Sequence, residues 1–107
     1  MKESNQNEQY PMVKTQKIPL ENGDAFGLLI PMATAPLILI KAKKGFVMCG
    51  YLNMAAANKL GDVAGKVSGV KTFDDVLNAN IVEVSDPAKN LGFAEGMNAR
   101  VFLSKLM

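Results

Sequence analysis

Residues 37–50, LILIKAKKGFVMCG, place two apolar runs on either side of a short basic turn. They predict a pair of antiparallel strands, 37–42 and 45–52, and the turn Lys43-Lys44-Gly45 fits a three-residue hairpin with Gly45 in the left-handed conformation. Both runs lack the apolar–polar alternation of a strand with one solvent-facing side. We therefore expect helices or another subunit to cover both faces of these strands.

Two more strands are predicted upstream, over residues 12–20 and 24–32. Between them lies Glu21-Asn22-Gly23, and the Asn-Gly pair favours a tight hairpin turn because both residues tolerate positive φ. Pro31 and Pro36 interrupt the connection to the next strand, since proline cannot donate a ladder hydrogen bond. The four segments predict an antiparallel β-meander.

Downstream of the meander, the sequence predicts short helices and two irregular strands. Residues 62–71 and 80–84 read as short strands, the second at a sheet edge. Capping signals predict where the helices begin and end: Asn53 and Gly61 around residues 54–60, Thr72 with Asp75 before residues 73–79, and Ser85 with Pro87 before a turn that Gly92 ends.

The last predicted helix covers residues 97–106. Its apolar residues recur at i, i+3, i+4 and i+7, which predicts one buried stripe: Ala99, Phe102, Leu103 and Leu106. The predicted fold class is α+β, with an antiparallel β-meander in the N-terminal half packed against short helices from the C-terminal half.

The length of 107 residues fits one domain, which we place at residues 12–107 after a polar tail, 1–11, expected to be disordered. The apolar runs are far shorter than the roughly 20 residues that cross a bilayer, and the N-terminus lacks a signal-peptide pattern. A single cysteine agrees with a reducing compartment. These observations predict a cytoplasmic protein with no membrane contact.

The composition also limits the chemistry. No histidine is present, which excludes Cys-His and Ser-His-Asp catalysis, and one cysteine without histidine excludes a tetrahedral zinc site of those ligands. Asp74-Asp75 is the best carboxylate pair for a metal, but acidic residues are favoured in the first turn of a helix without one. We expect no metal and no cofactor, and whether the protein is an enzyme stays open because no catalytic signature is present.

Two segments could still form a binding site. Cys49 lies in an apolar run, which favours an unreactive core thiol, although the start of the helix at Asn53 could stabilise a thiolate. Free amides from Gly69 to Thr72, with Lys71 nearby, could bind an anion, although turn-forming glycines explain that segment more simply. Lysines cluster near residues 41–44 without interleaved aromatics, so nucleic acid binding is not expected.

Three segments together resemble a known family: GFVMCGYLN (45–53), GKVSGVKTFDDVLNA (65–79) and LGFAEGMNARVFLSKL (91–106). Over residues 12–107 the chain resembles the YunC-like family of small, uncharacterised bacterial and archaeal proteins. The resemblance implies a compact α+β domain without an assigned activity. Its pattern falls on residues with no established catalytic role: Cys49, Gly50, Gly69, Val70, Thr72, Gly96 and Arg100.

The sequence thus supports two hypotheses from different classes. The first is a small interaction or structural domain that forms homo-oligomers, because its apolar runs are too continuous for so short a chain to cover alone. The second is a site for a small anionic ligand, which could be enzymatic. The residues assigned to that site are Cys49, Gly50, Gly69, Lys71, Thr72 and Arg100.

Overall fold

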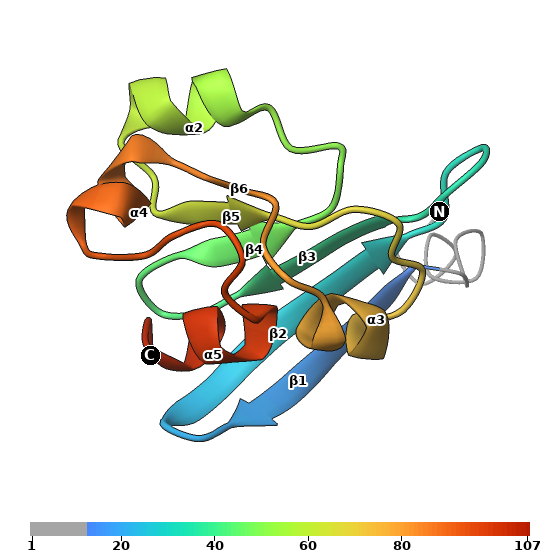
Figure 1. The fold of residues 1–107 in the computed structure, drawn as a ribbon. Coiled ribbons are helices and arrows are strands. Elements are labelled where there is room, and N and C mark those ends of the chain that lie inside the picture. Colours follow the sequence, from blue (N-terminus) through green and yellow to red (C-terminus); the bar gives the residue numbers. More distant parts are fainter. Residues whose placement is uncertain (1–12) are drawn as a thin grey trace, which may run out of the picture.

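A computed structural model describes residues 13–107, so the predicted tail at 1–11 lies outside the described residues. The domain is built on a six-stranded sheet in which the strands follow one another in sequence order (Figure 1). The predicted α+β class is confirmed: in residues 13–107 the meander comes first and the helices follow it. The elements are β1 (Lys14–Leu20), β2 (Gly23–Ile30), β3 (Leu37–Lys41), β4 (Phe46–Met48), α2 (Met54–Leu60), β5 (Ala64–Lys66), α3 (Phe73–Asn78), β6 (Glu83–Val84), α4 (Asp86–Asn90) and α5 (Ala99–Ser104).

Both predicted hairpins form, each with a shorter turn than predicted. Leu20 pairs with Gly23, which takes a φ of 151°, so only Glu21 and Asn22 lie in the first turn. In the second, Ala42 donates its backbone N–H to the Gly45 carbonyl at 2.8 Å. The predicted three-residue turn is therefore wrong, because the turn consists of Lys43 and Lys44 alone.

Gly45 serves a different purpose from the one predicted. It is not among the glycines with positive φ. A Cβ at this position would lie 2.5 Å from the Val63 carbonyl oxygen and 2.8 Å from Leu106 Cδ1. Glycine is needed here because the segment before β5 and the end of the chain pass too close for any side chain.

The sheet is antiparallel except between β4 and β5, which run parallel. Parallel neighbours need a crossover connection, and residues 49–63 with helix α2 supply it. This crossover brings the segments that follow β4 and β5 to the same end of the sheet. The hairpin-based prediction of a meander gave no sign of this arrangement, although β6 does lie at the predicted sheet edge.

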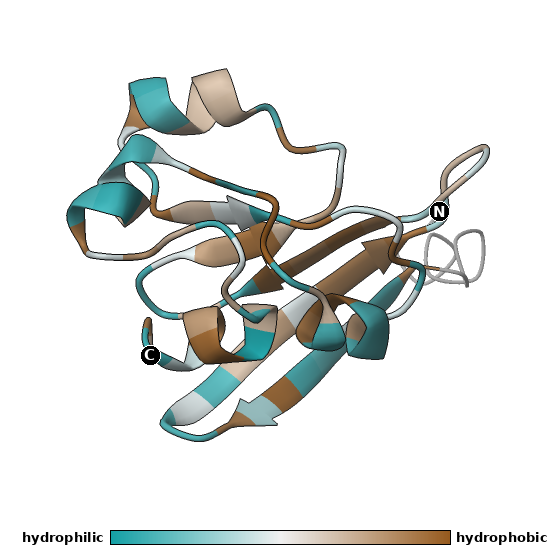
Figure 2. Cartoon of the chain, in the orientation of Figure 1, coloured by the Kyte–Doolittle hydropathy of each residue, from teal (hydrophilic) through white to brown (hydrophobic). Residues whose placement is uncertain are grey.

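Helices α3 and α5 cover one face of the sheet (Figure 1). Ile38, Ile40 and Val47 are fully buried beneath them. The predicted stripe on α5 is confirmed, since all four of its members are buried in the same core. Figure 2 shows β3 coloured mainly as hydrophobic, whereas β1 is hydrophilic over its first part and hydrophobic only toward its end.

The other face of the sheet is only partly covered. Helix α2 packs Met54 and Ala57 over Phe46 and Ala64 at one end. On the rest of this face, Leu28 and Leu39 are half-buried and Phe26 is 55% exposed. Within residues 13–107, the full cover on both faces that was predicted for the central strands is therefore achieved only near α2.

The predicted helix caps form. Asn53, Thr72 and Ser85 each accept a hydrogen bond from the backbone N–H three residues later, at 3.1, 3.0 and 3.3 Å. The last helix is shorter than predicted because Asn98 caps it at Ala99. No helix within residues 13–107 has the length and apolar character needed to span a membrane.

Candidate functional site

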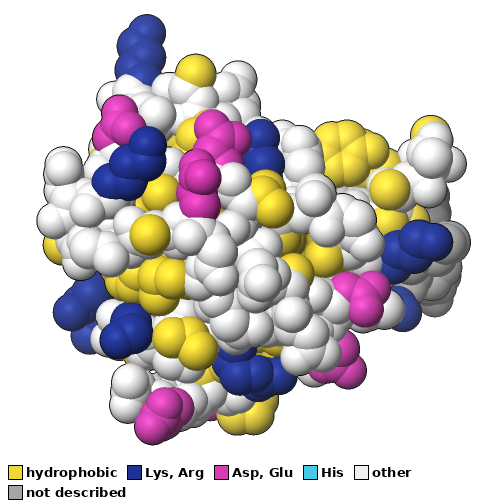
Figure 3. Space-filling view, in the orientation of Figure 1, with side chains coloured by type: hydrophobic (Ala, Val, Ile, Leu, Met, Phe, Trp, Pro, Cys, Tyr) yellow, Lys and Arg dark blue, Asp and Glu magenta, His cyan; other side chains and the backbone are white. Residues whose placement is uncertain are grey.

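A pocket of about 390 Å³ lies at the end of the sheet where the parallel strands β4 and β5 finish. We call it the end pocket. Three segments line it: residues 34–36 before β3, residues 49–51 after β4 and residues 68–71 after β5. Ligands commonly bind beyond the carboxyl ends of parallel strands, because the loops there diverge. Figure 3 shows apolar side chains at this end of the molecule, at the upper right, and a second apolar group on the left of the visible face.

Cys49 forms the inner wall of the end pocket and is also part of the main core, with 5% of its surface exposed. Its Sγ accepts a hydrogen bond from the Ile38 N–H at 3.3 Å and donates one to the Pro36 carbonyl at 3.8 Å. A protonated thiol can make both of these bonds, whereas a thiolate would lose the second. The geometry therefore favours a structural thiol that anchors the start of β3.

We predict that Cys49 is protected from thiol reagents in the folded protein, because burial limits access to Sγ and both of its hydrogen-bonding positions are filled. Its rate of reaction with an aromatic disulfide should be at least about tenfold lower in buffer than in urea. Both rates can be followed by absorbance at one pH. Equal rates in the two solvents would show that this thiol is accessible and available for chemistry.

Tyr51 supplies the aromatic surface of the end pocket, and the sequence analysis missed it. Half of its surface is exposed, and its hydroxyl donates to the Ala35 carbonyl at 3.4 Å. This bond ties the segment after β4 to the loop before β3. The sequence offered one signal, an aromatic residue two positions after Cys49. It did not show that Tyr51 faces the loop before β3, because that contact depends on the path of the chain after β4.

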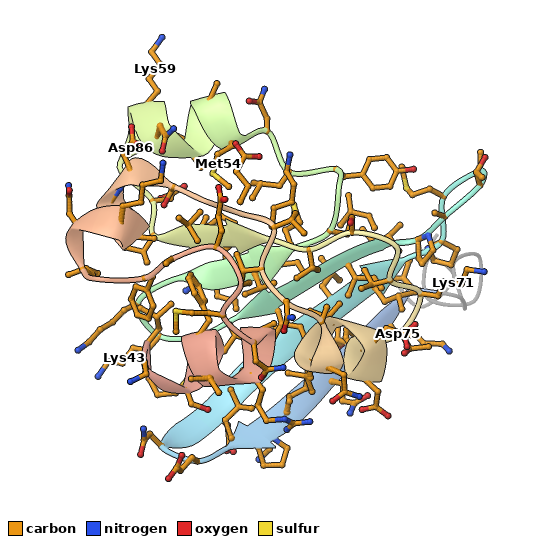
Figure 4. The ribbon with its side chains drawn as sticks, in the orientation of Figure 1. Lys43, Met54, Lys59, Lys71, Asp75 and Asp86 are labelled. Carbon is orange, nitrogen blue, oxygen red and sulfur yellow. The ribbon has the colours of Figure 1, made fainter. Side chains whose placement is uncertain are left out.

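Lys71 lines the end pocket, while Thr72 lines an adjoining depression beside it. The predicted anion-binding amides are partly used by the protein itself. Asp75 Oδ2 accepts a hydrogen bond from the Lys71 N–H at 3.0 Å, and Thr72 Oγ1 accepts one from the Asp75 N–H. The Asp75 carboxylate thus occupies the place at the start of α3 where an external anion was expected, and Figure 4 shows Lys71 and Asp75 on this side of the molecule.

The structure brings together four of the six residues assigned to the site from the sequence: Cys49, Gly50, Gly69 and Lys71. Arg100 lies elsewhere, on α5, where it lines a different depression beside the β1–β2 turn. Lys43 marks the turn between β3 and β4 and lies far from Lys71 in Figure 4. Among residues 13–107, Lys71 is the one cation that lines the end pocket.

Metal ligands do not gather in the described part of the chain. No group of three or more Cys, Asp or Glu side chains in residues 13–107 is placed to hold a metal ion. The two carboxylates considered for a metal, Asp74 and Asp75, have different surroundings. Asp75 accepts a hydrogen bond from the backbone at the start of α3, while Asp74 is exposed to solvent.

Three comparisons with known proteins agree. A family model described as "Domain of unknown function (DUF1805)" matches residues 48–106. The "Uncharacterized protein YunC" of Bacillus subtilis (strain 168) is 31% identical over 100 residues, which cover 90% of this chain and 99% of that protein. A solved structure, "Crystal Structure of a Protein of Unknown Function TA1206 from Thermoplasma acidophilum", superposes with a TM-score of 0.86 at 41% identity and covers 90% of this chain and 94% of that one.

Proposed function

The chain belongs to the DUF1805 family of domains of unknown function, as its three motifs indicated, and we propose that it is an interaction domain that pairs with a second copy of itself. The observation that carries this proposal is the part of the sheet face opposite α3 and α5 that no other segment of residues 13–107 covers. We call it the open face and define it by Phe26, Leu28, Leu39 and Met48. A buried, unpaired Cys49 is compatible with a reducing compartment, and we propose the cytoplasm as the place of this pairing.

The open face follows from the register of the strands. Phe26 lies opposite Lys41, while Leu28 lies opposite Leu39, which in turn lies opposite Met48. Residues that are directly opposite share a face of the sheet, so these apolar side chains form a continuous surface. An antiparallel sheet with one wet face normally carries polar residues there, and this face departs from that pattern.

Charged residues surround the open face with both signs present. On the same side of the sheet, Lys17 lies 4.0 Å from Asp24 at one edge, and Lys66 lies 3.3 Å from Glu83 at the other. An apolar centre with a polar rim is the usual anatomy of a protein interface. Because each copy carries lysines and carboxylates on the rim, two copies related by a two-fold axis can pair opposite charges, which favours a second copy over an unlike partner.

The proposal predicts a mass twice that of the 11.5 kDa chain at micromolar concentration, measured by light scattering after size exclusion. Phe26→Glu should convert the protein to a monomer, because two carboxylates would be buried at the centre of the interface. Val101→Glu is the matched control, since Val101 is an exposed apolar residue on α5, on the other side of the sheet. A monomeric wild-type protein, or a dimer that Phe26→Glu leaves intact, would refute the pairing.

A second candidate function is the binding of a small anionic ligand in the end pocket. The observation that favours it is the convergence of Gly50, Gly69 and Lys71 from two separate segments at one concave surface. A thermal-shift screen of small carboxylates and phosphates tests this function independently of the oligomeric state. Stabilisation by no anion would leave the pairing proposal standing and remove this one.

A further inference from the structure

We infer that the ligand of the end pocket is a small carboxylate with an aromatic body, and that Gly50 is the residue that makes room for it. This inference rests on the proposed binding function of the end pocket and adds the ligand class and the residue that determines access. Three observations carry it: a glycine that the fold itself does not need, a mainly apolar wall, and a single cation beside an acidic group.

Gly50 is the first observation. Its φ lies outside the positive range that favours glycine, and a Cβ built on it meets no atom within 4 Å. In contrast, Gly27 and Gly45 would each bring a Cβ within 3 Å of a neighbour. Neither backbone conformation nor packing therefore requires glycine at position 50, although glycine costs conformational entropy on folding. A glycine at this position leaves the backbone of the pocket wall open to close approach by a ligand.

The wall of the end pocket is the second observation. Pro36, Val70 and the ring of Tyr51 supply apolar surface from three different segments. The hydrogen bond from the Tyr51 hydroxyl to Ala35 holds the ring in place, so that it can pack against a planar ligand without losing much conformational freedom. The thiol of Cys49 has both of its hydrogen-bonding partners within the protein and adds a further nonpolar contact. A volume of about 390 Å³ is at the small end of the range for ligand pockets.

The charge at the rim is the third observation and selects the anionic group. Within residues 13–107 the Lys71 ammonium makes no salt bridge, so it is available to a ligand. The Asp75 carboxylate already accepts a hydrogen bond from the Lys71 N–H, and Asp74 is the neighbouring residue in the first turn of α3. The Lys71 ammonium can neutralise one negative charge, and the second charge of a dianionic phosphate would lie unpaired beside Asp74 and Asp75. These carboxylates therefore disfavour phosphate more strongly than a monoanion. A carboxylate is the common monoanion that a single lysine can bind through a charge-assisted hydrogen bond.

The test uses the full chain labelled with ¹⁵N, titrated separately with benzoate, benzamide and inorganic phosphate. Benzoate should shift the amide signals of Gly50, Gly69 and Lys71. Benzamide has the same shape without the charge and should bind about fivefold more weakly, which is the size of one exposed ion pair. Inorganic phosphate should shift none of these three signals.

Two variants with one control locate the site. Gly50→Leu should weaken benzoate binding by at least about tenfold, because its side chain fills the pocket, while the melting temperature stays within a few degrees of wild type because nothing packs at that position. Lys71→Gln should reduce benzoate affinity to that of benzamide. Ala55→Leu adds the same side chain at an exposed position of α2 and should change neither property.

Each result separates the inference from the function on which it rests. If phosphate binds at Gly69 and Lys71 and benzoate does not, the carboxylate class is wrong and the anion site stands. If benzoate binds equally well to Gly50→Leu and wild type, the role of Gly50 is wrong. If neither anion shifts the three signals, the binding function of the end pocket fails together with the inference. Should Gly50→Leu not fold, Gly50→Ala gives the same comparison with a smaller side chain.

Discussion

Replacing Ser85 with alanine is expected to destabilise the domain by about 3 kcal/mol, because one hydroxyl joins residues 62–64 to the start of α4 through three hydrogen bonds. Its Oγ donates to the Asp62 carbonyl at 2.7 Å and accepts from the N–H groups of Ala64 and Ala88 at 3.0 and 3.3 Å. These bonds use the full capacity of a hydroxyl, which is completely buried here. Alanine would leave the Ala64 N–H without its partner at the start of β5 and would remove the cap of α4.

The measurement is urea unfolding followed by circular dichroism. Ser104→Ala is the matched control, since Ser104 is also buried but its hydroxyl makes no hydrogen bond within residues 13–107. This control should change the free energy of unfolding by less than about 1 kcal/mol. Equal losses from the two substitutions would show that Ser85 contributes through burial alone and not through its three hydrogen bonds.

Ser85 also shows how far the sequence predicts the fold. Capping residues, turn residues and apolar spacing are local signals, and they predicted the four short helices and the first four strands of residues 13–107. Two of these elements are markedly shorter than predicted: the strand expected over 45–52 ends at Met48, and the helix expected over 97–106 covers Ala99–Ser104. The sequence predicted Ser85 as a helix cap, which it is. Its two bonds to the segment before β5 join residues more than twenty positions apart, and no local pattern encodes such a contact. The parallel pairing of β4 with β5 was missed for the same reason.

The candidate site was predictable to a similar extent. Cys49, Gly50, Gly69 and Lys71 stand next to strand ends, where turns and loops concentrate binding residues. Their convergence depends on the crossover that places the ends of β4 and β5 side by side. Thr34 and Pro36 enter the same pocket from a third segment, with no signal of their own in the sequence. The Asp75 contact to the Lys71 amide required coordinates, because it depends on the side-chain rotamer.

Phe102→Ala is expected to have the largest effect of any substitution considered, a loss of about 4 kcal/mol of unfolding free energy. The ring is completely buried where α5 meets the sheet. The centroid of the ring lies 4.7 Å from that of Phe93 at an interplanar angle of 49°. Its Cζ lies over the backbone of β5 at Gly65. A Cβ at Gly65 would lie 2.9 Å from Ile81 Cδ1, which is too close, and 3.4 Å from Phe102 Cζ, which is ordinary contact. Gly65 is therefore required mainly by the packing of Ile81, with the Phe102 ring beside it.

The cavity left by Phe102→Ala should not close readily, because Gly65 offers no side chain to fill it and Ile38, Ile40 and Val47 are held by the sheet. Calorimetry should therefore show a fall in melting temperature on the order of 15 °C or more for a domain of this size. Val101→Ala is the matched control, because Val101 is the neighbouring residue on the same helix but its side chain is 45% exposed. This control should change the free energy of unfolding by no more than about 0.5 kcal/mol. A similar loss from both would show that burial of the Phe102 ring is not the dominant contribution of α5. A loss confined to Phe102 would identify the contact of this ring with Gly65 and Phe93 as the one that joins the C-terminal helix to β5 and to the segment after α4.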